Sequence, residues 1–298
     1  MTPEAKHISV CICTFKRPNR LRGLLNELAR QYTDESFSYS AVVADNDSMQ
    51  SARQVVAEFA AASSLSVTYC VEPEQNIALA RNKALQNAKG DFIAFIDDDE
   101  FPGEDWLYNL VKTCKAYEVD GVLGPVKPYF EHKPPKWIVK GKFYERPTHK
   151  TGSVLHWTET RTGNVLFRRD IFNTAGKIFR QEFGMGGEDR DFFRRMIDKG
   201  FRFVWCAEAP VYEVVPPQRC KRSFMLKRAL LRGRIPHFSS FDIIKSVIAI
   251  PLYSMTLPVL SVSGHHRFMK YVIKDFDHIG RVLAFFGFDV IKQKYVIE

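Results

Sequence analysis

Residues 92–104 read FIAFIDDDEFPGE, an apolar run that ends in four consecutive acids, Asp97 to Glu100. The run predicts a buried strand, and the acids open directly onto a turn. Carboxylates that leave water repel one another and lose their hydration, so a cluster at this place implies a bound cation. Because alternate residues of an extended chain share a face, we expect Asp97 and Asp99 to point together and Asp98 to face away.

Two carboxylates at this spacing, a DXD pair, suit one divalent ion. Mg²⁺ and Mn²⁺ prefer oxygen ligands and commonly complete their coordination with waters and substrate phosphates, so two acids are sufficient protein ligands. The implied substrate is a nucleotide diphosphate. A solvated acidic turn at the protein surface is the structural alternative.

The first third of the chain alternates apolar runs with helical patterns. Strands and helices are expected in turn over residues 7–14, 19–31, 40–44, 51–62, 66–71, 77–88 and 92–96. The strands are continuous Val, Ile and Phe runs, which is typical of strands covered on both faces. The sequence therefore predicts an α/β fold with a mainly parallel central sheet flanked by helices. Ligands of such sheets bind at the carboxyl ends of the strands, where this chain has polar residues at Thr14, 45–48 and 97–100.

The 298 residues, 45% of them hydrophobic, suffice for one large domain with an appendage. The six cysteines are scattered and form no CxxC pair, so neither a disulfide framework nor a zinc site is expected. Cys11 and Cys13 are expected to be packing residues. The N-terminus shows no secretory signal, and a reducing cytosol is the expected compartment.

Basic charge is concentrated in residues 219–298, which hold 14 Lys or Arg against 5 Asp or Glu. Residues 1–218 are neutral overall. This difference predicts a main domain over 1–218 and a basic, apolar, helical appendage over 219–298. An anionic partner is expected for the appendage, and its apolar content favours lipid headgroups over nucleic acid.

Residues 243–262, IIKSVIAIPLYSMTLPVLSV, form a twenty-residue apolar stretch. Its length permits a membrane span, but Pro251 and Pro258 both interrupt helical hydrogen bonding and favour an in-plane or re-entrant hairpin. A true span and an ordinary helical core remain as alternatives. The expected location of the protein is cytoplasmic, peripheral on the inner face of the plasma membrane.

Five segments, taken in order, resemble the motifs of family 2 glycosyltransferases with the GT-A fold. They are ISVCICTFKRP, VVADNDS, EQNIALARNKAL, FIDDDE and GGEDRDFFRRM, and the match covers roughly residues 7–216. The resemblance implies a GT-A domain that transfers a sugar, as a hexosyltransferase does, from a nucleotide sugar.

On the donor side, the resemblance implies that Thr14 and Asp45 line the nucleobase pocket, where Asp45 can accept the imide hydrogen of uracil. Arg81 then lies near the base and the phosphates. Asp97 contacts the ribose, and Asp99 binds the metal that bridges both phosphates and assists the departing nucleoside diphosphate. The structural alternatives are an Asx-type turn at Asp45 and a helix-surface position for Arg81.

On the acceptor side, the resemblance implies that Asp189 deprotonates the acceptor hydroxyl opposite the leaving group, so that a single displacement inverts the anomeric carbon. Glu188 helps to orient the acceptor. The alternative is a plain helix start, with both acids at the positive end of the helix dipole. Gly163 and Asn164 match the family segment that lines the donor sugar and acceptor pocket.

Glu213 stands where many relatives have a metal-binding histidine. It is a candidate second metal ligand, and the alternative is an ion pair with an arginine such as Arg219 or Arg222. Arg219 is also a candidate substrate-binding residue. The segment that begins at Gln218 lacks the QxxRW spacing of processive synthases, so we expect one sugar to be transferred per encounter.

Together with the acidic motif, the resemblance implies an inverting glycosyltransferase that depends on Mn²⁺ or Mg²⁺ and moves one sugar from a nucleotide sugar, in the first instance a UDP-sugar. By the same resemblance, the expected acceptor is a polyprenyl-diphosphate-linked or other glycan of bacterial envelope polysaccharide assembly. A sugar-phosphate nucleotidyltransferase is one alternative, but the chain has 15–18, FKRP, where such an enzyme needs a glycine-rich loop. A non-catalytic membrane adaptor is the other, and it would not need Asp99 and Asp189 together.

Overall fold

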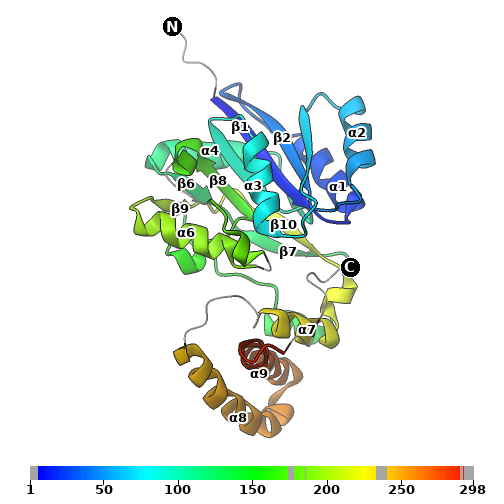
Figure 1. The fold of residues 1–298 in the computed structure, drawn as a ribbon, viewed down its shortest axis with the longest axis vertical. Coiled ribbons are helices and arrows are strands. Elements are labelled where there is room, and N and C mark those ends of the chain that lie inside the picture. Colours follow the sequence, from blue (N-terminus) through cyan, green and yellow to red (C-terminus); the bar gives the residue numbers. More distant parts are fainter. Residues whose placement is uncertain (1–5, 174–177, 185, 233–239, 289–290, 292–298) are drawn as a thin grey trace. The chain divides into compact units, whose positions relative to one another are not determined.

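The computed structural model describes residues 6–173, 178–184, 186–232, 240–288 and 291 (Figure 1). The chain divides into two compact units. The first consists of Met1–Lys127 and Arg146–Glu213, and the second of Pro128–Glu145 and Val214–Glu298. The segment Pro128–Glu145 thus groups with the C-terminal part of the chain, although its place in the sequence suggests the first unit.

The first unit is built on a seven-stranded sheet in the order β3-β2-β1-β4-β8-β6-β9. Its strands are β1 (Lys6–Thr14), β2 (Phe37–Asp45), β3 (Val67–Val71), β4 (Phe92–Ile96), β6 (Gly121–Leu123), β8 (Asn164–Arg168) and β9 (Phe203–Trp205). All neighbouring strands are parallel except β8, which is antiparallel to both β4 and β6. The predicted α/β fold with a mainly parallel central sheet is confirmed.

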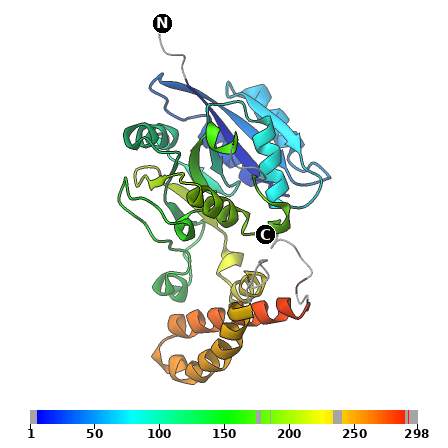
Figure 2. The ribbon, with the colours of Figure 1, turned by 60° about the vertical axis from the view of Figure 1, so that its left-hand side comes forward.

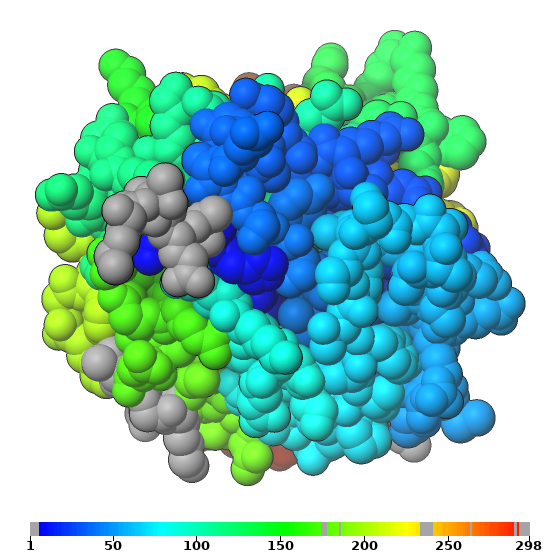
Figure 3. Space-filling model, turned by 90° about the horizontal axis from the view of Figure 1, so that it is seen from above, coloured from blue at the N-terminus to red at the C-terminus, as the bar shows by residue number. Residues whose placement is uncertain are grey.

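Helices cover both faces of this sheet, and each face has its own apolar core (Figure 1). The helices are α1 (Pro18–Leu28), α2 (Arg53–Ala62), α3 (Ile77–Asn87), α4 (Trp106–Tyr117) and α6 (Glu188–Asp198). Within β1, Val10 and Ile12 pack with α1, α2 and α4, whereas Cys11 packs with α3 and α6. Because both faces are covered, the strand is apolar at successive positions. Figure 3 shows the end of this unit at which β1 begins.

A second, three-stranded sheet has the order β5-β10-β7. Its strands are β5 (Glu100–Pro102), β10 (Val211–Val215) and β7 (Val126–Phe130). Strand β10 is antiparallel to β5 and places Glu213 directly opposite Glu100. The chain enters the second unit within β7, returns to the first between Glu145 and Arg146, and leaves it again within β10. Short 3-10 helices of the first unit are η1 (Trp157–Glu159), η2 (Arg169–Asn173) and η3 (Gln181–Phe183).

The second unit is helical. Its elements are α5 (Lys136–Gly141), η4 (Pro217–Cys220), α7 (Arg222–Arg232), α8 (Ser240–Ser263) and α9 (His265–Phe285). Helix α9 packs against α8 and α7 (Figure 2). A small core that includes Ile138, Met225 and Met269 holds α5, α7 and α9 together.

Helix α8 is continuous, so the expected break at its prolines is wrong. Pro251 and Pro258 both lie inside the helix. Each proline removes one backbone donor, but both are exposed, so the carbonyl groups that lose a partner lie open to the surroundings and the helix need not break.

The segment Phe241–Val262 is long and apolar enough to cross a membrane. Its mean hydropathy is 1.7, and only 11% of this apolar stretch is buried. A core helix would be mostly buried, so the alternative of an ordinary helical core does not fit this chain by itself.

Two serines of α8 form hydrogen bonds with α9. Ser246 is fully buried, and its hydroxyl lies 3.0 Å from both His278 Nδ1 and Arg281 Nη1. Ser254 donates a hydrogen bond of 3.0 Å to Asp275. Helix α8 therefore turns Ser246 and Ser254 toward α9 and exposes many of its large apolar side chains, unlike a helix on a soluble core.

Candidate active site

The acidic turn follows β4 at the carboxyl end of the sheet. β4 ends at Ile96, and the Glu100 N–H donates to the Asp97 carbonyl at 3.1 Å, which closes a turn. The expected strand alternation is therefore wrong. Because the extended backbone stops at Ile96, Asp98 and Asp99 approach one arginine together, and Asp97 faces a different one.

Arg17 is the cation shared by Asp98 and Asp99. Its Nη1 lies 3.1 Å from Asp98 Oδ1 and 3.2 Å from Asp99 Oδ2. The Thr14 hydroxyl donates to the other oxygen of Asp98 at 2.8 Å. Adjacent strands β1 and β4 thus bring Thr14 and the acids together, as expected. Nothing in the sequence singled out Arg17, although it lies only three residues after Thr14 at the start of α1.

Glu213 joins the acidic turn through the second sheet. It lies opposite Glu100 in the β10–β5 pair, and like charges at such positions destabilise a sheet unless something offsets them. Glu213 forms an ion pair with Arg146, a partner far along the chain that the sequence did not indicate.

Asp97 and Glu100 hold protons more tightly than usual. Loss of hydration raises the pKa of Asp97, although its side chain is 46% exposed; Arg81 opposes this effect, and Asp99 and Glu213 add to it. Burial also raises the pKa of Glu100 well above its usual range, with added repulsion from Asp97 and Glu213. Oxygen ligands that repel one another fit a hard divalent cation.

Within the described ranges, no group of three or more His, Cys, Asp or Glu residues forms a complete metal site. An ion such as Mg²⁺ or Mn²⁺ usually takes one or two carboxylates together with waters and substrate phosphates, and Asp99 and Glu213 could supply that set.

Gly163 approaches the acidic turn closely. A Cβ added to it would lie 2.9 Å from Glu100 Oε1 and 3.0 Å from Asp97 Oδ2, so a larger residue would push into the carboxylates. The sequence prediction that Gly163 belongs to the site agrees with this position, and its contact with a sugar stays a prediction.

Asn164 is buried, and its side-chain amide is engaged within the protein. Nδ2 donates to the carbonyls of Pro125 and Ala209 at 3.0 and 2.8 Å, and Oδ1 accepts from the Trp106 indole at 2.8 Å. These bonds hold the start of β8 in place. Asn164 therefore positions Gly163, and a direct role in a sugar pocket stays a prediction.

Asp45 is fully buried at the end of β2. Its carboxylate accepts hydrogen bonds from the Asp47 N–H at 3.1 Å, the Ala52 N–H at 2.8 Å and the Tyr69 hydroxyl at 2.9 Å. The Asx-type structural role is thus present. A contact with uracil stays a prediction.

Arg81 connects the acidic turn with the start of α6. It is only 6% exposed, so the alternative of a helix-surface arginine is wrong. It forms an ion pair with Glu188, its Nη2 lies 3.4 Å from Asp97 Oδ1, and its guanidinium lies over the ring of Phe179. Burial lowers the pKa of Arg81, but Glu188 and Asp97 raise it by more, so the side chain stays charged.

Glu188 is the first residue of α6 and follows Gly187, whose φ is +94°. Its side chain is buried, and burial raises its pKa to about 7, against the effect of Arg81 and with the help of Asp189. Oε2 of Glu188 is buried without a hydrogen-bond partner among the described residues. A substrate hydroxyl could supply the missing donor.

Asp189 is partly exposed, and its Oδ1 accepts from the Arg190 N–H at 2.7 Å. Its charge acts on Glu188, Arg81 and Arg161. The two halves of the predicted site therefore meet in one region, linked by the contacts from Asp97 through Arg81 to Glu188.

Arg219, a predicted substrate-binding residue, belongs to the second unit. It is buried in η4, and its carbonyl accepts the Tyr144 hydroxyl at 2.7 Å. Its role toward a substrate stays a prediction.

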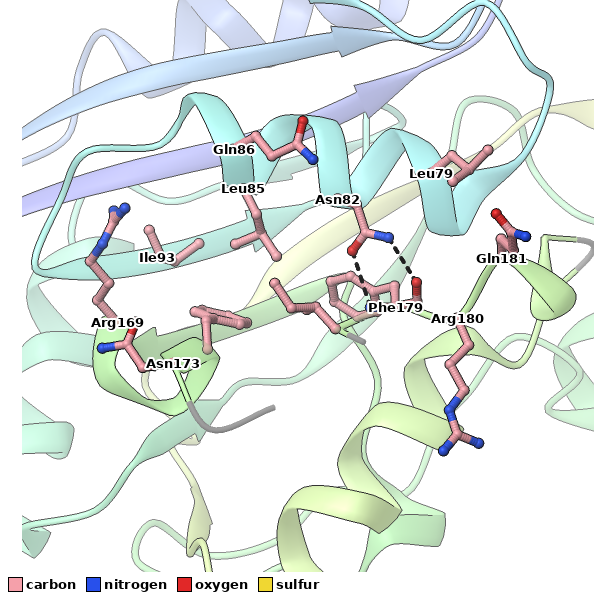
Figure 4. A pocket seen from close by; sticks show the side chains of 12 residues that line it. Leu79, Asn82, Leu85, Gln86, Ile93, Arg169, Asn173, Phe179, Arg180 and Gln181 are labelled. Atoms are coloured by element: carbon pink, nitrogen blue, oxygen red, sulfur yellow. Dashed lines mark hydrogen bonds between the residues drawn. The ribbon is translucent and has the colours of Figure 1, made fainter. Parts of the chain in front are cut away.

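A separate cavity of about 460 Å³ lies beside α3 (Figure 4). The Asn82 side chain at its edge donates to the Phe179 carbonyl at 2.7 Å and accepts from the Phe179 N–H at 3.1 Å. None of the predicted site residues lines this cavity, so the chemistry of the candidate site lies at the acidic turn and not here.

Known proteins resemble this chain in sequence. The model of the family described as glycosyl transferase family 2 matches residues 9–176. The succinoglycan biosynthesis protein ExoM of Rhizobium meliloti (strain 1021) is 37% identical over 238 residues, which cover 78% of this chain and 75% of that protein.

Solved structures resemble it in fold. The mannosyltransferase PcManGT from Pyrobaculum calidifontis, in complex with GDP-Man and Mn²⁺, has a TM-score of 0.63 and 18% identity over 94% of this chain and 88% of that chain. Residues 1–349 of S. aureus TarS, in complex with UDP-GlcNAc, have a TM-score of 0.52 and 15% identity over 96% of this chain and 95% of that chain. At these identities the likeness concerns the fold.

Proposed function

Because this chain belongs to glycosyl transferase family 2 and has the GT-A fold, we propose that it transfers one sugar from a UDP-sugar to a hydroxyl of a lipid-linked glycan, with inversion and with Mn²⁺ or Mg²⁺. It is a glycosyltransferase of polysaccharide biosynthesis. The observation that carries the finer proposal is the chain of contacts from Asp97 through Arg81 to Glu188, which joins the two halves of the site.

The donor half is formed by the ends of β1, β2 and β4. In the proposal Thr14 and Asp45 border the nucleobase, Asp97 contacts the ribose, and Arg81 lies near the phosphates. Asp99 and Glu213 would hold the divalent ion. When bound, the ion supplies positive charge that stabilises the departing nucleoside diphosphate.

The acceptor half lies at the start of α6. The Asp189 carboxylate takes the proton of the acceptor hydroxyl while that oxygen forms a bond to the anomeric carbon. The bond from the anomeric carbon to the diphosphate oxygen breaks at the same time, and the electron pair leaves with the diphosphate. Glu188 orients the acceptor, because its unpaired Oε2 can accept a hydrogen bond.

The second unit would hold the enzyme at an anionic membrane surface. Helix α8 exposes large apolar side chains, among them Leu252, Met255 and Val259, and the surrounding segment is basic. Such a helix binds membranes by apolar burial together with attraction to acidic lipids. Attachment on the inner face of the plasma membrane would bring the enzyme to a polyprenyl-diphosphate-linked acceptor.

Membership of the glycosyltransferase family argues against both alternative functions, the nucleotidyltransferase and the membrane adaptor. A glycosyltransferase needs the acids of both halves, which a membrane adaptor would not, and it needs no glycine-rich loop for a triphosphate. The missing QxxRW spacing supports transfer of a single sugar per encounter.

The proposal is tested by a donor screen. The purified full chain is incubated with Mn²⁺ and a panel of UDP-, GDP- and TDP-sugars, and release of nucleoside diphosphate is measured with and without EDTA. We expect release from one UDP-sugar, lost on chelation. Release that persists in EDTA would remove the metal from the proposal, and release only from another nucleotide would remove the UDP-sugar.

A further inference from the structure

A small enclosed cavity of about 80 Å³ lies in the first unit, next to the acid cluster. Its lining includes Arg146, His149, Glu159, Arg161 and Trp205. Arg146 is the ion-pair partner of the proposed metal ligand Glu213, which fixes the position of the cavity beside the site. Ligand pockets for drug-sized molecules begin at roughly 300 Å³, so this cavity suits a small group and not a whole sugar ring.

Two of the lining residues carry N–H donors without an acceptor in the described part of the chain. Trp205 is 6% exposed, and its buried indole Nε1 has no hydrogen-bond partner there. Arg161 is partly exposed, and its guanidinium forms no hydrogen bond or ion pair with the described residues. Burial lowers the pKa of Arg161, and the neighbouring charge of Arg146 lowers it further. A guanidinium nevertheless keeps its charge, so an unpaired cation lines the cavity.

The carboxylates near the cavity, Glu159 and Glu213, already have partners within the protein. His149 Nε2 lies 3.2 Å from Glu159 Oε1, and the other oxygen of Glu159 accepts the His156 N–H at 3.1 Å. Glu213 is paired with Arg146. The cavity therefore combines the N–H donors of Arg161 and Trp205 with a carboxylate, Glu159, whose two oxygens already have partners within the protein, and such donors are the chemistry that binds an oxyanion.

The position of Arg161 places that oxyanion beside the proposed site. Arg161 lies two residues before Gly163, which approaches Asp97 and Glu100, and it lines the same cavity as Arg146, the partner of Glu213. The effect of the Asp189 charge on the pKa of Arg161 agrees with this position. In the proposed function, a group held there belongs to the acceptor.

We propose that Arg161 and the Trp205 indole bind an oxyanion of the acceptor, either the carboxylate of a uronic acid or a phosphate group. This inference rests on the proposed function, because the acceptor is defined by it. It makes this cavity a specificity site that distinguishes acidic acceptors from neutral ones.

The test uses the full chain saturated with UDP and Mn²⁺ and three probes: glucuronate, glucose 6-phosphate and glucose. Their affinities are measured by ligand-observed NMR. We expect at least one anionic probe to bind about tenfold more tightly than glucose, and Arg161→Gln to remove this advantage. Trp205→Phe, which keeps the ring and removes the N–H, should reduce it about threefold. Arg161→Lys should retain part of it.

The matched control is Arg168→Gln at the exposed end of β8, the strand that begins three residues after Arg161, and this variant should change nothing. Preference for glucuronate assigns a uronate, and preference for glucose 6-phosphate assigns a phosphate. Equal affinities of all three probes, or an advantage that survives Arg161→Gln, would overturn the inference, as would an equal loss of UDP affinity. Failure of UDP-sugar turnover in the donor screen, with the anion preference intact, would instead sink the proposed function.

Discussion

In most proteins apolar side chains are buried and charged side chains are exposed, and the two units of this chain depart from this pattern in opposite ways. The first unit buries charge: Asp98, Glu100, Arg81 and Glu188 all lie inside it. The second unit exposes apolar side chains along α8, while Ser246 and Ser254 form hydrogen bonds with α9. Buried charge and exposed apolar surface both cost stability, so each marks a place where a partner outside the chain is expected. For the first unit we expect a metal and substrates, and for the second a membrane.

The largest effect should come from Asp189, which is partly exposed. Asp189→Asn removes the proposed base, and general bases typically contribute 10²- to 10⁴-fold, so we expect kcat to fall about 1,000-fold. UDP affinity should stay within about twofold, because the residue acts on the acceptor. Turnover and UDP titration check both. Asp198→Asn, at the exposed end of the same helix, is the control, and a loss of UDP binding in Asp189→Asn would give that residue a structural role.

Burial of Glu188 should appear as a pH dependence of stability. Its pKa rises from the usual value of 4.5 to about 7 in the folded protein. Because the folded state binds this proton more tightly, the free energy of unfolding should fall as the pH rises from about 4.5 to 7. In Glu188→Gln this fall should be smaller by about 3 kcal/mol.

Denaturant unfolding of the metal-free full chain at several pH values measures the difference. Exposed Glu182 provides the control, since Glu182→Gln should leave the pH dependence unchanged. If the free energy of unfolding changes with pH in the same way in wild type and in Glu188→Gln, Arg81 keeps Glu188 ionised over the whole pH range.

Membrane binding tests the second unit. Leu252 and Val259 are 59% and 72% exposed on α8. Fully burying such side chains is worth about 1.5–3 kcal/mol each, so replacing both with Glu should weaken binding to vesicles with acidic lipids by at least about 30-fold. Vesicle sedimentation measures this effect. Met49→Glu, at an exposed apolar residue of the first unit, should bind like wild type; equal binding of all three proteins would leave α8 without a membrane role.

The order of elements could be predicted from the sequence, because each apolar run between 7 and 96 was long enough to define its strand. The site was only partly predictable. Asp97, Asp99 and Arg81 stand out as motif residues, but Arg17 and Arg146 pair with the acids through the fold, and no local pattern marks them. The predicted break at the prolines of α8 was wrong. It rested on the lost hydrogen bonds alone, and the sequence does not show that both prolines are exposed.

A smaller effect is expected for Asp99→Asn. If Asp99 holds the ion, this change should weaken UDP binding in Mn²⁺ about tenfold, or about 1.4 kcal/mol, and leave UDP binding in EDTA unchanged. Calorimetric titration with UDP, once in Mn²⁺ and once in EDTA, separates the metal-dependent part of the UDP affinity from the metal-independent part. Asp105→Asn, at the start of α4, is the control. Equal losses with and without metal would make Asp99 a partner of Arg17 only.

The smallest effect separates the two explanations of Glu213. If Glu213 is a metal ligand, the Glu213→Gln substitution should lower the Mn²⁺ affinity about threefold, which corresponds to about 0.7 kcal/mol. As a partner of Arg146 alone, it should affect stability and not the metal, since the change leaves a cation without its carboxylate. Arg146→Gln distinguishes these cases: it also breaks the ion pair but keeps the carboxylate opposite Glu100. Unchanged Mn²⁺ affinity in Glu213→Gln would mean that the buried charge of β10 serves the fold and not the cation.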